Sequence, residues 1–128
     1  MKITHSSDKP LHWVGSAKKD LLGFPTNVVD DVGYALVVVQ QGGMPPSAKR
    51  WRGEGAGVLE IVEDHRRDTF RVVYTIRFER AVYVLHCFQK KSPSGVKTAS
   101  TDVDLIHERL KLAKADYEVR YGKKNRNY

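Results

Sequence analysis

The sequence has little cysteine and no long apolar run, and these two shortages exclude several classes of protein. Its single cysteine, Cys87, leaves no partner for an intrachain disulfide and no cysteine cluster for zinc. The longest apolar candidate, Tyr34–Val39, spans six residues, whereas a helix that crosses a bilayer needs about 18 to 20. The polar segment Met1–Pro10 lacks the apolar stretch of a secretory signal. We therefore expect a cytoplasmic protein with no membrane partner.

The chain also lacks an even distribution of charge. Its 128 residues carry a net charge of +7, with 41% hydrophobic and 29% charged residues, which is typical of one soluble domain. Residues 1–64 hold 7 basic and 8 acidic side chains, whereas residues 65–128 hold 15 basic and 7 acidic ones, a net charge of +8. A positive field of this kind favours a polyanionic partner, which is a nucleic acid, an acidic membrane surface or an acidic protein.

Hydrophobic periodicity predicts an α+β fold. Apolar residues recur every three or four positions in the first half and near the C-terminus, and they alternate in between. The segment 42–57 is rich in glycine and proline and is expected to be a loop. The prediction is two N-terminal helices, a three- to four-stranded antiparallel sheet and a C-terminal helix. The expected segments are an edge strand at Leu11–Val14, helices at Ala17–Leu22 and Pro25–Gln41, strands at 58–63, 69–78 and 81–89, and a helix at Thr101–Tyr121.

Motifs for metal or nucleotide chemistry are not found. The five histidines are scattered and none has a recognised ligand spacing, so no metal and no cofactor is expected. The run Gly53-x-Gly55-x-Gly57 lacks the Lys-Ser/Thr that follows in a phosphate-binding loop, and it precedes a strand. We interpret these glycines as turn geometry.

The most informative residues are cations on the expected sheet. If the strands at 69–78 and 81–89 form a hairpin, Arg71 and the pair Lys90-Lys91 lie at the same end of the sheet. Like charges placed together cost free energy unless an anion occupies the site. Two alternatives remain open: Lys90-Lys91 protects a strand edge, and Arg71 forms a cross-strand salt bridge with Glu60.

Further basic residues are candidates for contact with RNA. Trp51 stands among basic neighbours, an arrangement suited to stacking on bases, although a tryptophan that closes one end of the core is an equally good interpretation. The candidate RNA-binding residues are Arg50, Arg52, Arg66, Arg67 and Lys97.

Three sequence segments together resemble a known family. The segments "GVLEI" (57–61), "FRVVY" (70–74) and "VYVLHCFQKKSP" (82–93), in this order after two helices and a glycine-rich loop, are similar to the RelE/HigB superfamily of toxins. More narrowly, they resemble its phage-derived branch of host-inhibition or addiction-module toxins. The resemblance covers about residues 11–121 and implies a single toxin domain over 1–128, with a basic tail at 122–128.

The resemblance implies an activity and partners. Members of the superfamily cut messenger RNA, usually on the ribosome, and are neutralised by an antitoxin, here expected to be a helix-turn-helix protein. The family's catalytic arginine falls on Arg71, and the basic positions that close the last strand fall on Lys90 and Lys91. The implied reaction is attack of a 2′-hydroxyl on the adjacent phosphorus without a metal ion. In this scheme Arg71 holds the phosphate, Lys90 or Lys91 supplies positive charge or the acid, and His86 is a candidate base.

One departure from the family keeps other functions open. Glu60 stands where strongly cleaving relatives carry a lysine, so an RNA- or ribosome-binding protein without nuclease activity is the alternative. His86 lies between Val84 and Phe88, which favours a buried structural role. A third interpretation is that the basic half docks an acidic antitoxin segment. The sequence leaves the oligomeric state open.

Overall fold

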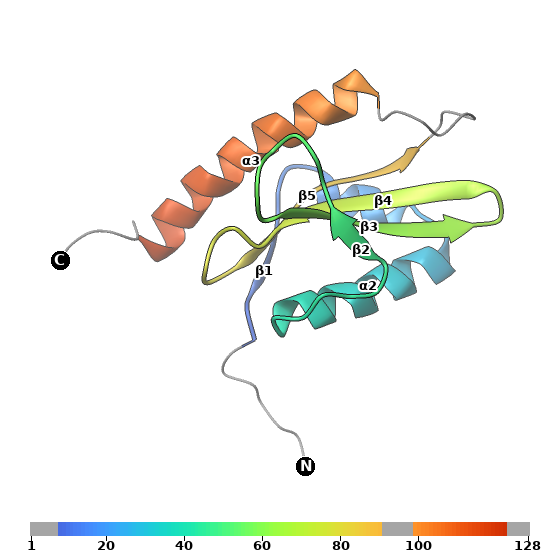
Figure 1. Cartoon of the computed structure of the whole chain (residues 1–128), viewed down its shortest axis with the longest axis horizontal. Helices are drawn as coiled ribbons and strands as arrows, with labels where there is room; N and C mark the ends of the chain where they lie inside the picture. Colours follow the sequence, from blue (N-terminus) through green and yellow to red (C-terminus); the bar gives the residue numbers. More distant parts are fainter. Residues whose placement is uncertain (1–7, 91–98, 123–128) are drawn as a thin grey trace, which may run out of the picture.

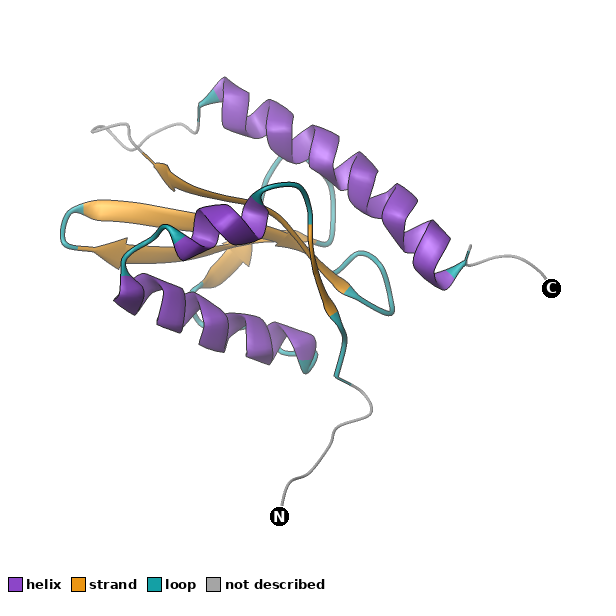
Figure 2. Cartoon of the chain, turned by 180° about the vertical axis from the view of Figure 1, so that it is seen from behind, coloured by secondary structure: helices purple, strands orange, loops and turns teal. Residues whose placement is uncertain are grey.

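The computed structural model of the protein describes residues 8–90 and 99–122. Figures 1 and 2 show a sheet with helices on both sides. The sheet has five strands in the order β1-β5-β4-β3-β2. The elements in chain order are β1 (Leu11–Trp13), α1 (Ala17–Leu22), α2 (Thr26–Gln40), β2 (Ala48–Arg50), β3 (Val58–His65), β4 (Asp68–Thr75), β5 (Val82–Lys90) and α3 (Ser100–Tyr121).

The α+β class is confirmed, but the sheet is larger than expected. The short strand β2 lies inside the segment expected to be a loop, and it pairs antiparallel with β3. Three residues are too few for alternation to be visible in the sequence. The edge strand β1 pairs parallel with β5, so the sheet is mixed rather than wholly antiparallel. These two strands lie far apart in the sequence, so no local sequence pattern indicates that they pair.

The helix α2 forms despite its many valines because its apolar stripe is buried. Val28, Val32, Ala35, Leu36 and Val39 are all buried against one face of the sheet, as their spacing predicted. The burial of this stripe outweighs the low helix propensity of β-branched residues. The helix ends at Gln40, just before the glycine pair 42–43.

The helix α3 covers the opposite face of the sheet. Ile106, Leu110 and Ala113 are buried in a second core cluster together with residues of β4 and β5. The helix begins at Ser100, one residue before the expected start at Thr101, and Ala99 takes the N-cap position without a side-chain hydrogen bond. Because both faces of the sheet are covered, β5 is buried over Val82–Phe88, as its apolar residues on both faces predicted.

The central hairpins have a defined register. The β3–β4 turn is tight, with His65 opposite Asp68 and Arg66 in a left-handed conformation at φ 55°. The strand β4 ends at Thr75, and residues 76–81 form a longer connection to β5 than the two-residue turn expected at 79–80. A register shift lies between Val73 and Tyr74, so Val73 faces His86 while Tyr74 faces Val84. This β-bulge sets which β5 side chains lie beside those of β4.

The burial of β5 predicts an unreactive cysteine. Cys87 is only 2% exposed, and burial raises the pKa of its thiol to about 12, so the nucleophilic thiolate is scarce at neutral pH. We expect no reaction of the native protein with Ellman's reagent and one thiol per chain after unfolding in guanidinium chloride. Fast labelling of the native protein, at a rate unaffected by low denaturant concentrations, would contradict this packing.

Candidate functional site

Polar side chains gather on the α3-facing side of the central strands. Lys49 on β2 lies opposite Glu60 on β3, Glu60 lies opposite Val73, and Val73 lies opposite His86. Residues directly opposite one another in a sheet project from the same face, so Lys49, Glu60 and His86 share the face that packs on α3. A charged residue within the apolar run 58–62 was the one sequence signal for a site at this position.

Arg71 and Lys90 lie on this same face. Arg71 is opposite Phe88, and Lys90 is opposite Thr69, two positions farther toward the β3–β4 turn. Alternation along each strand therefore places the guanidinium and the ammonium group on one side of the sheet at one end. The placement of Arg71 near Lys90 agrees with the register expected from the sequence. Lys91 and Lys97 fall outside the described residues.

Arg71 forms a nearly buried ion pair with Glu60. Its Nη1 donates a hydrogen bond of 2.6 Å to Oε1 of Glu60, and the two side chains are 13% and 8% exposed. The pair is diagonal, because Glu60 lies opposite Val73 and Arg71 lies opposite Val62. The cross-strand salt bridge considered from the sequence is thus confirmed. The Nε atom of Arg71 is buried and has no hydrogen-bond partner among the described residues.

The electrostatics extend this pair into a cluster of four charges. Burial, and then the positive charge of Arg71, lower the pKa of Lys90, while the Glu60 carboxylate acts in the opposite direction and Lys49 lowers it further. We call Lys49, Glu60, Arg71 and Lys90 the charged cluster. Three cations and one carboxylate give it a formal charge of +2. The Glu60 carboxylate therefore supplies part of the negative charge that reduces repulsion among the three cations.

His86 connects this face to the first turn of α3. Its Nε2 lies 2.8 Å from Oδ1 of Asp102, and its ring stacks on Phe88 with centroids 4.7 Å apart. The residue is 6% exposed, in agreement with the buried position that its neighbours indicated. Its Nδ1 is buried without a partner in the described part of the chain. Asp102 lies near the N-terminus of α3, where a negative charge is favourable.

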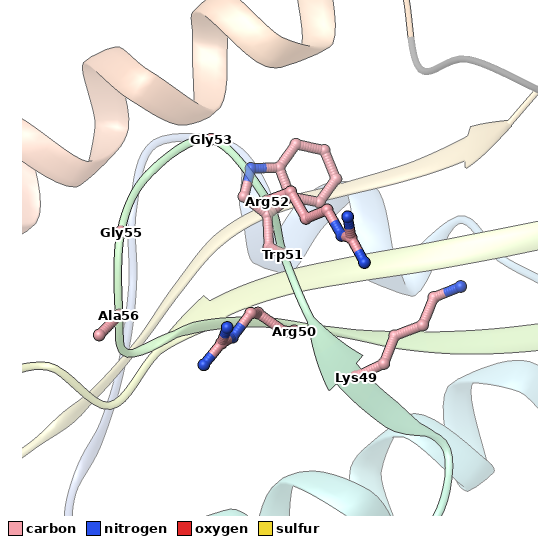
Figure 3. A pocket seen from close by; sticks show the side chains of 7 residues that line it. All are labelled: Lys49, Arg50, Trp51, Arg52, Gly53, Gly55 and Ala56. Carbon is pink, nitrogen blue, oxygen red and sulfur yellow. The ribbon is translucent and has the colours of Figure 1, made fainter.

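The segment that follows β2 encloses a hollow of about 690 Å³, which we call the loop hollow. Trp51 is 6% exposed and packs in the core cluster that includes Val58 and Val73, so the core-closing interpretation of this tryptophan is confirmed. The turn interpretation of the glycines is also confirmed, because all three have positive φ. Figure 3 shows the lining of the hollow, which is Lys49, Arg50, Trp51, Arg52, Gly53, Gly55 and Ala56.

The other predicted RNA-binding residues lie elsewhere. Arg66 and Arg67 are exposed at the β3–β4 turn, whereas Arg50 lies opposite Leu59. His65, the last residue before this turn, lies six positions beyond Leu59 along β3, about 20 Å away. The basic candidates therefore form two groups, with the charged cluster between them.

The described residues, 8–90 and 99–122, contain no group of three or more His, Cys, Asp or Glu side chains that could hold a metal ion. In the same ranges, no helix has both the length and the apolarity needed to cross a membrane.

Comparisons with known proteins concern most of the chain. Residues 19–111 match the model of the family described as phage-derived protein Gp49-like (DUF891). Among solved structures, a chain of the toxin–antitoxin complex RelBE2 from Mycobacterium tuberculosis is similar, with 19% sequence identity and a TM-score of 0.46. That likeness covers 70% of this chain and 100% of the other. No curated protein matches the sequence.

The buried ion pair predicts a characteristic pattern of stabilities. Arg71→Ala leaves the Glu60 carboxylate buried without its partner, and we expect it to lower the free energy of unfolding by about 3 to 5 kcal/mol. The double variant Arg71→Met with Glu60→Leu should recover most of this loss, because neither charge remains. Urea unfolding of the wild type, of Arg71→Met, of Glu60→Leu and of the double variant measures the coupling.

Arg67→Ala is the matched control for these variants, since it removes an exposed arginine of the adjacent turn. We expect it to change stability by less than about 0.5 kcal/mol. Strictly additive effects of the Arg71 and Glu60 substitutions would show that the pair does not act as a unit.

Proposed function

The chain belongs to the Gp49-like family of phage-derived proteins, a family of the RelE/HigB toxin type, and on that premise we propose that it is the toxin of a toxin–antitoxin pair. We propose further that it cuts messenger RNA in the cytoplasm, on the ribosome. The observation that carries this proposal is the charged cluster, in which three cations surround one carboxylate on a single face of the sheet.

The proposed reaction is an internal phosphoryl transfer. The 2′-oxygen forms a bond to the adjacent phosphorus, and the bond from phosphorus to the 5′-oxygen breaks. The 2′-hydroxyl loses its proton to a base, and the leaving 5′-oxygen gains a proton from an acid. The products are a 2′,3′-cyclic phosphate and a 5′-hydroxyl end. Stabilisation of negative charge on the phosphate oxygens and two proton transfers account for the catalysis.

Arg71 is the proposed phosphate ligand. Its planar guanidinium suits two oxygens of a phosphate, and its Nε has no partner among the described residues. When RNA binds, the phosphate replaces Glu60 as the partner of the guanidinium. Lys90, with Lys91 beside it in the sequence, adds positive charge or donates the proton to the leaving oxygen. Lys90 suits a proton donor because its surroundings lower its pKa.

Glu60 is a better proposed base than His86. The Glu60 carboxylate lies 2.6 Å from the guanidinium that would hold the phosphate, and it is released when Arg71 changes partner. His86 Nε2 is already bonded to Asp102, and its Nδ1 is buried. These contacts favour Glu60 over His86 as the proposed base. In this scheme, the carboxylate that departs from the family pattern takes part in the reaction.

The partner that restrains the toxin is proposed to be an antitoxin with an acidic segment and a helix-turn-helix domain. An acidic segment laid over the charged cluster would compete with RNA for the same cations. Acidic side chains and RNA phosphates offer the same charge, so one basic face serves both.

A second candidate function is RNA or ribosome binding without cleavage. The observation that favours it is the engagement of Arg71 Nη1 by Glu60 in a nearly buried pair. If the pair holds in the complex with RNA, Arg71 supports the fold and the exposed basic residues alone bind the polymer.

Expression in bacteria with mapping of messenger RNA 5′ ends tests the nuclease proposal. We expect the wild-type chain to stop growth and to produce new 5′-hydroxyl ends. Lys90→Ala should reduce cleavage about 10² to 10³ fold, because one group that stabilises the developing charge is removed. Glu60→Gln should reduce it about 10² to 10⁴ fold, because the amide cannot accept the proton.

The control for these variants is Lys18→Ala with Lys19→Ala on α1, on the opposite side of the sheet, which should cleave as the wild type does. Circular dichroism checks that each variant is folded. Binding to RNA without new 5′ ends, even with ribosomes present, would refute the nuclease proposal and support the second candidate. Full cleavage by Glu60→Gln would exclude Glu60 as the base.

A further inference from the structure

We propose that the loop hollow binds a backbone phosphate of the RNA strand, next to the phosphate held by the charged cluster. The inference rests on the proposed function in taking RNA as the polymer. The hollow has a volume of about 690 Å³ and lies along residues 49–56. Three of its lining residues, Lys49, Arg50 and Arg52, are cations with exposed side chains, and Figure 3 labels all three.

The wall of the hollow is fixed by contacts on both sides. The Arg77 guanidinium donates hydrogen bonds of 3.1 and 2.9 Å to the carbonyl of Ala56, and it also binds the carbonyl of Glu54. Gly57 has φ 86°, and a Cβ at this position would lie 3.2 Å from the Cα of Arg77. A side chain at Gly57 would therefore press against the neighbouring backbone. Because the loop is held in place before a ligand arrives, little ordering is needed on binding.

The hollow is positively charged because the acidic residue of the loop, Glu54, contacts His107 and does not line the hollow. Glu54 lies between lining residues, but its carboxylate is 3.0 Å from Nδ1 of His107 on α3, and its side chain is 9% exposed. Among the described residues that line the hollow, none is acidic. The lining therefore has a formal charge of +3, which favours an anion.

The chemistry of the lining favours a phosphate over a base. Trp51 is the aromatic residue of the lining, and it is buried in the core rather than offered as a stacking platform. Arginine and lysine side chains recognise phosphate oxygens of any nucleotide. We therefore infer contacts that add affinity and position the strand without selecting its sequence.

Lys49 connects the hollow to the charged cluster. It lines the hollow, it lies opposite Glu60, and its charge contributes to the environment of Lys90. A strand with one phosphate on Arg71 would thus meet Lys49 next and then the hollow that Lys49 lines. The arginines at the β3–β4 turn lie toward the other end of β3.

Binding of the full chain to a single-stranded, all-2′-deoxy oligonucleotide tests the proposal, because this probe cannot be cleaved. The variant is Arg50→Ala with Arg52→Ala, and fluorescence anisotropy measures affinity over a range of salt concentrations. Loss of the contacts to this one phosphate should reduce the slope of log affinity against log salt by about 0.7. At low salt we expect affinity to fall about tenfold or more, equally for different sequences.

The matched control is Lys18→Ala with Lys19→Ala, which removes the same two charges from α1. It should keep the wild-type slope. A second probe replaces each phosphate in turn with a neutral methylphosphonate. In the wild-type chain, replacement of one linkage next to the phosphate held by Arg71 should weaken binding. In the variant Arg50→Ala with Arg52→Ala, the same replacement should have no effect.

The outcomes separate this inference from the proposed nuclease. Unchanged affinity and slope in the double arginine variant would overturn the hollow as an RNA site, whether or not the wild type cleaves RNA. A wild type that never cleaves but shows the expected slope change would leave the hollow standing and refute the nuclease. A variant that keeps its RNA affinity but loses affinity for an acidic peptide would assign the hollow to a protein partner and overturn the proposal.

Discussion

The ion pair between Arg71 and Glu60 is the interaction on which the charged face of this protein depends. Both side chains are nearly buried, and each is the charged residue within an apolar stretch, 58–62 of β3 and 70–74 of β4. A buried charge is costly unless it is paired, so each residue requires the other. Their contact across β3 and β4 also offsets repulsion from the neighbouring lysines, because a carboxylate at the centre lets Lys49 and Lys90 lie close to Arg71. The pair thus stabilises the fold and assembles the cations.

The charged cluster and the loop hollow are held in place by different contacts. The charged cluster lies on the sheet, where the register of four strands holds it. The loop hollow lies beside it, where hydrogen bonds from Arg77 and the contact between Glu54 and His107 hold the loop. Lys49 belongs to both. A chain of cations on a rigid support fits an extended anionic polymer better than a small anion. Packing on α3 completes this face, because His86 contacts Asp102 at the start of that helix.

Local patterns predicted a large part of this fold. The stripe of α2 and the apolar runs of β3, β4 and β5 were visible, because burial imposes a period of 3.6 on a helix and favours apolar residues on both faces of a covered strand. The approach of Arg71 to Lys90 could be predicted because a short connection sets an antiparallel register. The strand β2 could not, since three residues carry no period, and neither could the parallel pairing of β1 with β5. The salt bridge between Arg71 and Glu60 was left open by the sequence, because strand patterns do not show which charged side chains meet.

Taken by itself, the sequence determined the helices, the three central strands and the positive charge of the second half, because each depends on residue type and spacing along the chain. Only the tertiary structure decided which charges meet. Contacts between distant segments set the pairing of Arg71 with Glu60 and the electrostatic interaction of Lys49 with Lys90. They also set the contact of Glu54 with His107, which keeps the Glu54 carboxylate out of the hollow. Electrostatic interactions act over a few ångströms in space, and residues far apart in the sequence come within that range only when the strands and helices pack together.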